Sequence, residues 1–306
     1  MRRGRGIALL VAVLAVAIAS LVLAALVAGG EDLRARQRHL LRLEQGWQLA
    51  LGLERWAELM MRRERQAGGD YDAWDRPWLQ PLPPLPVPGG TVSGGLADAS
   101  GCLNLNALVP GETPDPVVRA RLERLLDLLG LPRTIAAQAI DWIDPDLLPE
   151  PGGAEDPAYL AMRPPRRAAN RPFLALGELI HLPDVDEAAL ERLRPHVCAL
   201  PDPSAPINVN FASPELLMAL DPAIDRATAE ALHADGRAAF ASEQAVLEAL
   251  AARGVALASL PGVAVRSRYL LARATVRIDD VPMVFTALLE HRDARLEPVW
   301  RRAGPP

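Results

Sequence analysis

A cluster of acidic residues between positions 141 and 156 holds the side chains in this sequence best suited to chemistry. The carboxylates belong to Asp141, Asp144, Asp146, Glu150, Glu155 and Asp156, in a stretch rich in proline and glycine. Hard oxygen ligands of this kind suit calcium, which takes about six to eight of them. The spacing is not that of an EF-hand. The alternative is a solvated acidic loop paired with Arg163, Arg166 and Arg167, and the residues alone leave both interpretations open.

The rest of the sequence argues against an enzyme. Its 5 histidines are scattered, and it contains no HExxH, GxSxG or phosphate-binding motif. All 33 basic residues are arginine, so lysine-based catalysis and a Walker A lysine are excluded. Paired acids near Asp144 could serve a glycosidase only beside a sugar cleft, and aromatic residues make up just 4% of the chain. We therefore expect a non-catalytic protein without an organic cofactor.

The chain contains 2 cysteines, Cys102 and Cys198, too few for a cysteine-only zinc site. If the body of the protein lies outside the cytoplasm, they can form a disulfide. Two unpaired buried thiols are the alternative, because sequence spacing alone does not bring two side chains together.

The strongest pattern is an apolar segment at residues 7–28, interrupted by no charged residue. As a helix it would measure roughly 33 Å, enough to cross a bilayer. Arg2, Arg3 and Arg5 precede it, so the positive-inside rule places the N-terminus in the cytoplasm and the body on the far side of the membrane. The segment is too long for a cleavable signal, and proline-free, helically periodic sequence continues to Gln66. We expect one helix over residues 7–66 that crosses the inner membrane once, at residues 7–28; a plain signal anchor is the alternative.

The residues before the apolar segment resemble a prepilin peptidase site, with a basic leader that ends at Gly6 and cleavage before Ile7. The leader would be residues 1–6. Most pilins and pseudopilins carry glutamate at mature position five, which here is Val11. In those proteins the carboxylate is thought to pair with the amino terminus of a neighbouring subunit. An unpaired carboxylate in lipid is costly, so a subunit at the end of a fibre gains nothing from one.

The body divides into sheet-forming and helical regions. Residues 67–90 are rich in proline, glycine and aspartate and are predicted to be a loop. Alternating residues at 91–109, 267–278, 283–291 and 295–301 predict strands, with a turn at Asp279 and Asp280. The predicted fold is α+β: a pilin-like long helix on a small antiparallel sheet, formed by residues 67–107 and 256–306.

Residues 108–255 carry helical periodicity and are predicted to be an all-α insertion of two modules, at about 108–200 and 205–255. Each module resembles a helix-hairpin-helix or SAM-like unit. Such hairpins bind nucleic acid through glycine-rich turns, whereas these turns, at 183–186 and 221–225, contain aspartate and proline. The net charge of −5 also argues against nucleic acid. An anchored DNA-binding protein is kept as an alternative.

Several blocks in order resemble the minor pseudopilin K family of type II secretion systems, the general secretion pathway protein K family. They lie at residues 98–106, 141–146, 153–156, 164–170, 207–210 and 265–269. The resemblance implies a subunit that caps the tip of a periplasmic pseudopilus and helps to initiate its assembly. The lack of glutamate at Val11 is also what the K-type tip subunit shows. A minor pilin of a type IV pilus or competence pseudopilus is the alternative.

The resemblance also implies partners and a metal. The partners would be the I- and J-type minor pseudopilins, the major pseudopilin, the prepilin peptidase and the inner-membrane assembly platform. Members of the family bind calcium in the helical domain, which favours calcium over a solvated loop. The expected ligands are Asp144, Asp146, Glu155, Asp156 and Asn170.

Overall fold

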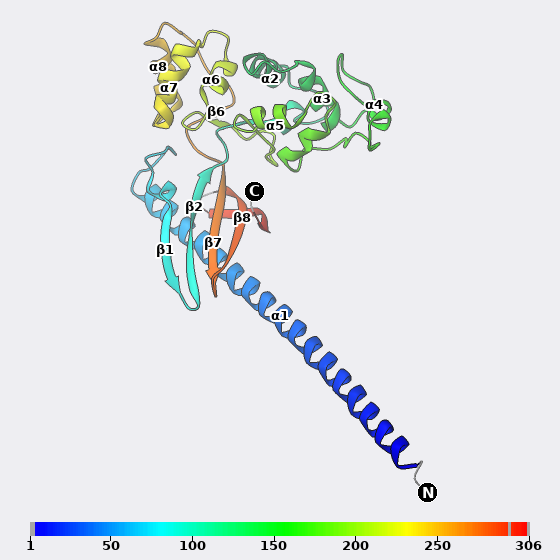
Figure 1. Ribbon diagram of the computed structural model, residues 1–306. Coiled ribbons are helices and arrows are strands. Elements are labelled where there is room, and N and C mark those ends of the chain that lie inside the picture. The colour runs from blue at the N-terminus through cyan, green and yellow to red at the C-terminus, as the bar shows by residue number, and fades with distance from the viewer. Residues whose placement is uncertain (1–3, 293–294, 305–306) are drawn as a thin grey trace.

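A single helix dominates the shape of the molecule in this computed structural model, which describes residues 4–292 and 295–304. Helix α1 (Gly4–Gln66) projects far out of the body, and its N-terminal end is the part most distant from it (Figure 1). Its segment Leu9–Leu26 has a mean hydropathy of 3.0, and none of it is buried. This segment is long and apolar enough to cross a membrane. Residues 1–3 of the predicted leader lie outside the described residues.

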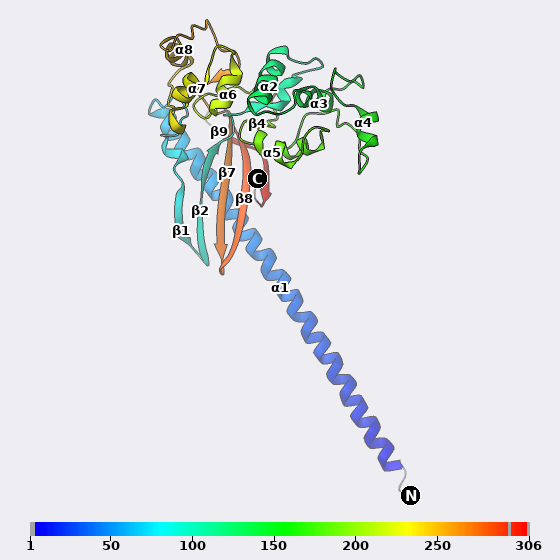
Figure 2. The ribbon, with the colours of Figure 1, turned by 45° about the horizontal axis from the view of Figure 1, so that its top comes forward.

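The second half of α1 packs on a five-stranded antiparallel sheet with the strand order β1-β2-β7-β8-β9. The strands are β1 (Leu82–Val87), β2 (Gly90–Asp98), β7 (Tyr269–Ile278), β8 (Val281–Arg292) and β9 (Arg295–Ala303). Ala50, Leu53, Ala57 and Met61 of the helix are buried against alternate residues of the strands. Figure 2 shows the helix crossing one face of the sheet. The predicted α+β class, with a long N-terminal helix on an antiparallel sheet, is confirmed.

Strand β1 corrects the prediction of a loop throughout residues 67–90. It contains Pro83, Pro84 and Pro86, yet it pairs with β2 at the edge of the sheet. Proline lacks a donor for a second neighbouring strand, which an edge strand does not need. A short 3-10 helix, η1 (Pro77–Leu79), precedes the strand and buries Trp78.

Two ion pairs attach α1 to the sheet. The predicted turn at Asp279 and Asp280 joins β7 to β8, and both residues adopt positive φ angles, as in a type I′ hairpin. Asp279 accepts a hydrogen bond from Arg42 of the helix at 3.0 Å. Higher on the helix, Glu54 pairs with Arg301 of β9 at 2.7 Å. The orientation of the helix on the sheet is therefore fixed at two separate levels.

The helical insertion lies between β2 and β7 and forms the end of the body opposite the N-terminus (Figure 1). Its first module contains β3 (Leu103–Asn104), η2 (Leu105–Leu108), α2 (Pro116–Leu128), α3 (Thr134–Ile143), α4 (Asp156–Ala161), η3 (Leu176–His181), α5 (Glu187–Leu193) and β4 (Val197–Cys198). Its second module contains β5 (Ile207–Asn208), α6 (Pro214–Leu220), α7 (Arg226–His233), η4 (Ala234–Gly236), α8 (Glu243–Ala251) and β6 (Val263–Ala264). Both modules contribute to one hydrophobic core.

The two modules share one arrangement, a pair of short parallel strands and a buried asparagine. Each opens on a two-residue strand that pairs in parallel with a strand near its end, β3 with β4 and β5 with β6. In the first module, the Asn106 side chain bonds both the N–H and the carbonyl of Phe173. In the second, Asn210 makes the same two bonds with Phe240. The repeated asparagines therefore close each module by satisfying buried backbone groups.

Candidate functional site

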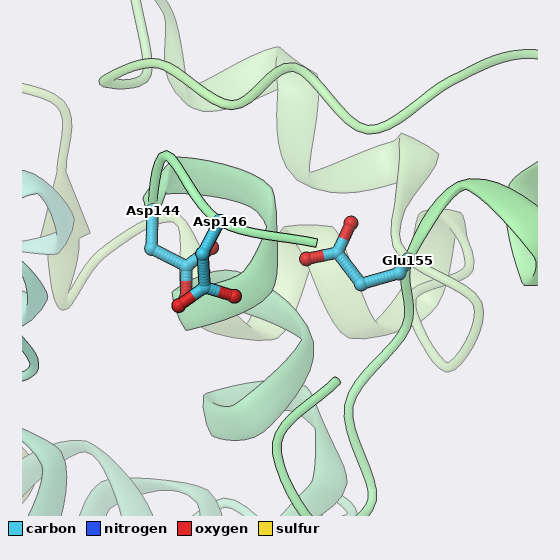
Figure 3. A group of neighbouring side chains, drawn as sticks. All are labelled: Asp144, Asp146 and Glu155. Carbon is cyan, nitrogen blue, oxygen red and sulfur yellow. The ribbon is translucent and has the colours of Figure 1, made fainter. Parts of the chain in front are cut away.

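Three carboxylates of the acidic cluster converge where α3 ends and α4 begins. Asp144 follows the last residue of α3, Asp146 lies two residues further on, and Glu155 immediately precedes α4. One ligand atom of each residue lies within 4.8 Å of the other two. Figure 3 shows the Glu155 side chain reaching toward Asp144 and Asp146 from the opposite side. Residues from the two ends of the loop thus meet at one point.

The burial of these carboxylates is not matched by hydrogen bonds. Asp144 is 4% exposed and Glu155 is 3% exposed. Within the described part of the chain, Asp144 Oδ1 and both carboxylate oxygens of Glu155 have no hydrogen-bond partner. Buried charges without partners are costly, and a bound cation would supply the missing contacts. Asp146 is exposed, so the cluster opens toward solvent on that side.

Because these carboxylates are buried and close to one another, their pKa values are raised. Burial raises the pKa of Asp144 to about 6, and repulsion from Asp146 and Asp141 adds to the effect. Burial also raises the pKa of Glu155 to about 7, and repulsion from Asp141 and Asp144 adds to the effect. A divalent cation would stabilise the ionised carboxylates and reverse this tendency.

Asp141 supports the loop from within the fold. Its side chain is fully buried on α3, and its Oδ1 accepts the Glu150 N–H at 3.0 Å. A Cβ atom on Gly153 would lie 1.9 Å from Asp141 Oδ2, so the loop passes the carboxylate too closely for any other residue. The sequence places Asp141 in the acidic cluster but gives no sign of this role, which depends on the close approach of residues 150–153.

The other two predicted ligands are placed differently. Asp156 accepts the Ala168 N–H at 3.0 Å and lies 3.4 Å from Arg167. Asn170 donates from its side-chain amide to the Asp146 carbonyl at 2.9 Å. The geometry therefore brings together Asp144, Asp146 and Glu155, while Asn170 fixes the backbone of the cluster and Asp156 is engaged elsewhere. The three convergent groups are all hard oxygen donors, the set that calcium or magnesium prefers.

Cys102 and Cys198 form a disulfide in the structure. The bond joins the start of the first module to its end, where β3 and β4 run in parallel. It lies close to the junction with the sheet, since Ala99 N–H bonds to the Tyr269 carbonyl at 3.0 Å. The beginning and end of the first module are therefore linked covalently.

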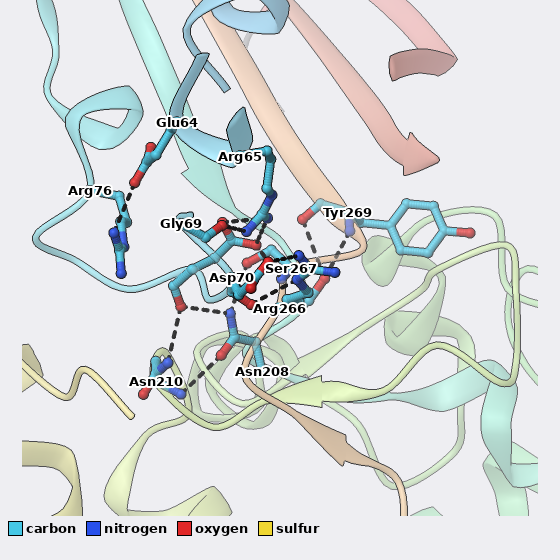
Figure 4. Close-up of polar contacts among 12 residues, drawn as sticks. Glu64, Arg65, Gly69, Asp70, Arg76, Asn208, Asn210, Arg266, Ser267 and Tyr269 are labelled. Atoms are coloured by element: carbon cyan, nitrogen blue, oxygen red, sulfur yellow. Dashed lines mark hydrogen bonds and ion pairs between the residues drawn. The ribbon is translucent and has the colours of Figure 1, made fainter. Parts of the chain in front are cut away.

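A buried polar network holds the helical insertion on the sheet (Figure 4). Its centre is Asp72, which pairs with Arg65 of α1 at 2.6 Å and accepts the Ser267 N–H at 2.9 Å. The Asp72 carbonyl accepts side-chain hydrogen bonds from Asn208 and Asn210, both at 3.1 Å. Helix, sheet and insertion therefore meet at one residue that sequence reasoning missed. The repeat of the 103–106 pattern at 207–210 marks Asn208 and Asn210, but it gives no sign of Asp72.

The aspartates of the two hairpin turns cap helices. Asp186 accepts the Ala189 N–H at the start of α5, and Asp225 accepts the Thr228 N–H at the start of α7. Phosphate would compete with these carboxylates for the same donors and would be repelled by their charge. The turns therefore serve helix formation.

Comparisons with known proteins agree with one another. Two family models described as type II secretion system, protein K, match residues 101–202 and 207–265. The type II secretion system protein K of Pseudomonas aeruginosa is 34% identical over 99% of this chain and 94% of its own length. That of Pectobacterium carotovorum is 30% identical over 99% of this chain and 97% of its own.

A solved structure has the same fold. It is a chain of the GspK-GspI-GspJ complex of the type 2 secretion system of enterotoxigenic Escherichia coli. The TM-score is 0.74 at 23% identity, with 89% of this chain and 100% of the other covered.

Proposed function

The chain belongs to the type II secretion system protein K family, and from this premise we propose that it caps the tip of the pseudopilus and helps to initiate its assembly. Membership makes it a minor pseudopilin of a protein secretion system. Its proposed role is structural and non-catalytic. The chain would be held in the inner membrane by α1, with its N-terminus in the cytoplasm and its body in the periplasm.

The observation that carries the proposal is the position of the helical insertion. It extends the body at the end opposite the apolar half of α1 (Figure 2). In a fibre whose subunits are added from the membrane, this end faces the subunit added earlier. A body of this size, fixed to the sheet through Asp72, would leave no room for such a subunit. The chain therefore fits the first position of the fibre.

Val11 supports the same position. It is 56% exposed on the apolar half of α1, where a glutamate would need a partner amine from a subunit above. At the first position that amine is missing, and the carboxylate would stay unpaired in an apolar environment.

Glutamate substitutions test the tip position. Val11→Glu and the matched control Val13→Glu each place one carboxylate in the apolar segment, and at the tip neither finds a partner. We expect both variants to reduce secretion to a similar degree at equal protein levels. Full secretion with Val11→Glu together with loss of secretion for Val13→Glu would reveal a partner amine above this chain, and the tip position would be wrong.

The proposed partners are the I- and J-type minor pseudopilins, the major pseudopilin and the assembly platform. Support comes from the similarity of this chain to a chain of the GspK-GspI-GspJ complex. Co-purification of the full chain with its genomic I- and J-type neighbours tests this. If type IV minor pilins co-purify in their place, the chain would instead be a minor pilin of a type IV pilus or competence pseudopilus.

We propose processing by prepilin peptidase between Gly6 and Ile7, supported by the basic residues that precede an uninterrupted apolar helix. Mass spectrometry of the chain from peptidase-positive cells should show Ile7 at the N-terminus. An intact N-terminus would contradict the proposal.

We propose that Asp144, Asp146 and Glu155 hold calcium, which would order the loop between α3 and α4. The support is the unpaired buried oxygens of Asp144 and Glu155. Calcium that binds only the folded state adds about 2.7 kcal/mol of stability at 100 times its Kd. Melting of the full chain in lipid nanodiscs should therefore occur at a higher temperature with calcium than with EDTA.

Two variants and one control assign the calcium ligands. Asp144→Asn and Glu155→Gln should each remove most of the calcium-dependent shift, because they take away a charged donor from the cluster. Asp156→Asn is the control, since its side chain bonds Ala168 N–H and lies near Arg167. An equal loss in all three variants would argue against the three-residue site, and no calcium effect on the parent chain would reject the metal.

A further inference from the structure

The face of the sheet that points away from α1 carries an apolar row beneath the helical insertion. The strand register places four residues side by side across β2, β7, β8 and β9: Ala97, Leu271, Leu288 and Trp300. All four line a hollow of about 1020 Å³. Leu176 and Cys198 of the insertion line the same hollow from above. Leu288 is 5% exposed and belongs to a buried cluster with Leu200, so Ala97, Leu271 and Trp300 are the accessible members of the row. The row is therefore the floor of a groove roofed by the first module.

A basic row runs parallel to the apolar one. Arg273 of β7 pairs in register with Thr286, and Thr286 pairs with Arg302 of β9. This row lies two residues from the apolar row on the same face, a separation of about 7 Å. Arg273 and Arg302 are exposed, and neither forms an ion pair with a carboxylate in residues 4–292 and 295–304. By contrast, the adjacent Arg301 is paired with Glu54 on the other face.

The groove continues toward the β1 edge. A second hollow of about 490 Å³ shares Leu96, Ala97 and Leu271 with the first and is also lined by Arg273. Asp98 lies at the upper end of the groove, but its Oδ2 accepts the N–H groups of Ser100 and Gly101. Its carboxyl group is therefore directed into the junction, and the lower border of the groove stays basic.

We propose that this groove binds an extended segment of a partner protein in which apolar and acidic residues alternate. Successive side chains of an extended chain point to opposite sides. One set would contact the apolar row and the insertion, and the other would reach Arg273 and Arg302. Four strands span about 14 Å, which equals the length of about five extended residues. Charge complementarity selects an acidic occupant over a basic one.

Three capped octapeptides test this: alternating leucine with glutamate, with serine and with lysine. Each carries a fluorophore, and anisotropy is measured with the full chain in phosphatidylcholine nanodiscs, corrected for empty nanodiscs. The acidic peptide should bind at least tenfold more tightly than the serine peptide, and the lysine peptide should bind least. Equal binding of the three, or no binding of the acidic peptide at 1 mM, would overturn the proposal.

Variants locate the binding. Arg273→Glu with Arg302→Glu should weaken the acidic peptide at least tenfold and favour the lysine peptide. The control, Arg253→Glu, makes the same kind of charge change after α8 and should leave affinity unchanged. Ala97→Trp adds a large ring to the exposed floor of the groove and should abolish binding. Unchanged affinity in either groove variant, with melting within about 2 °C of the parent, would also overturn the proposal. These outcomes are independent of the tip position.

Discussion

At the scale of single residues, Asp98 is the clearest source of pH dependence. One of its oxygens accepts the N–H groups of Ser100 and Gly101, and the Ser267 side chain also favours the ionised carboxylate. Burial raises its pKa from 3.8 to about 7, against the opposing effect of the hydrogen bonds. The folded protein therefore holds a proton that the unfolded chain releases between about pH 4 and pH 7.

This difference in pKa between the folded and unfolded states predicts whether replacing Asp98 raises or lowers the stability of the protein. Stability associated with Asp98 is greatest below pH 4 and falls as the pH rises through 7, because the unfolded state then binds fewer protons. Asp98→Asn keeps an acceptor for the two N–H groups and removes the titration. We expect the free energy of unfolding at pH 8 to rise by on the order of 1 kcal/mol, with little gain at pH 4. Denaturant titrations of both proteins at the two pH values measure this. A gain that is equal at both would contradict it.

The residues differ in how far the sequence reveals their roles. The acidic cluster is visible because its members lie close together in the chain, but the sequence does not reveal that Asp144, Asp146 and Glu155 are the ones that converge. Asp72 is not visible, because its partners Asn208 and Ser267 come from the far side of the insertion. Ionic and hydrogen-bond partners at such separations are set by the tertiary fold, which no local pattern encodes.

At the scale of elements, two glycines of α1 differ in their surroundings and form a matched pair. A Cβ atom on Gly46 would lie 2.9 Å from the Phe285 ring, whereas one on Gly52 would meet nothing within 4 Å. Gly52→Ala should stabilise the protein by about 0.5–1 kcal/mol through helix propensity. Gly46→Ala should destabilise it by about 1 kcal/mol or more, because overpacking against Phe285 outweighs the same gain.

Thermal melting of the two variants beside the parent checks this pair. The helix propensity term is common to both, so the difference between them reports the close packing of α1 on β8. Equal stabilisation by both alanines would show that Phe285 moves away without cost and that the helix is not fixed at this level.

Local pattern predicted most of the elements. Helices α2 to α8 all lie within residues 108–255, where helical periodicity predicted them, and the strands β7, β8 and β9 lie near their predicted positions. The turn at Asp279 and Asp280 was also correct, because short polar residues adopt positive φ more readily than others. Strand β1 was missed because its three prolines are compatible with a strand only at an edge, and edge position is a property of the whole sheet.

At the scale of the whole molecule, the insertion leaves the sheet and returns to it at one place. Residues 99 and 269 are hydrogen-bonded neighbours, although the entire insertion separates them in the chain. We call α1, residues 67–101 and strands β7 to β9 the stem. The hydrophobic cores between α1 and the sheet contain residues of the stem alone, such as Ala57 with Leu270 and Leu53 with Val276. The pilin-like stem thus has its own hydrophobic core, and both members of the Arg65–Asp72 ion pair belong to it. The stem should therefore fold when residues 102–266 are replaced by a short glycine-serine linker.

Deleting the insertion makes it possible to test separately the two features proposed to keep this chain out of the fibre interior. In the proposed tip position, the insertion would block a subunit above, and Val11 would offer no carboxylate to the amino terminus of that subunit. We expect the deletion alone to enter the fibre interior poorly and Val11→Glu alone to remain at the end. The combination should appear at many positions along fibres of the major pseudopilin, as seen by immunogold labelling. If the combined variant labels one end only, then steric exclusion and the missing charge do not explain the tip position. If the deletion alone spreads along the fibre, the insertion is sufficient and Val11 adds nothing.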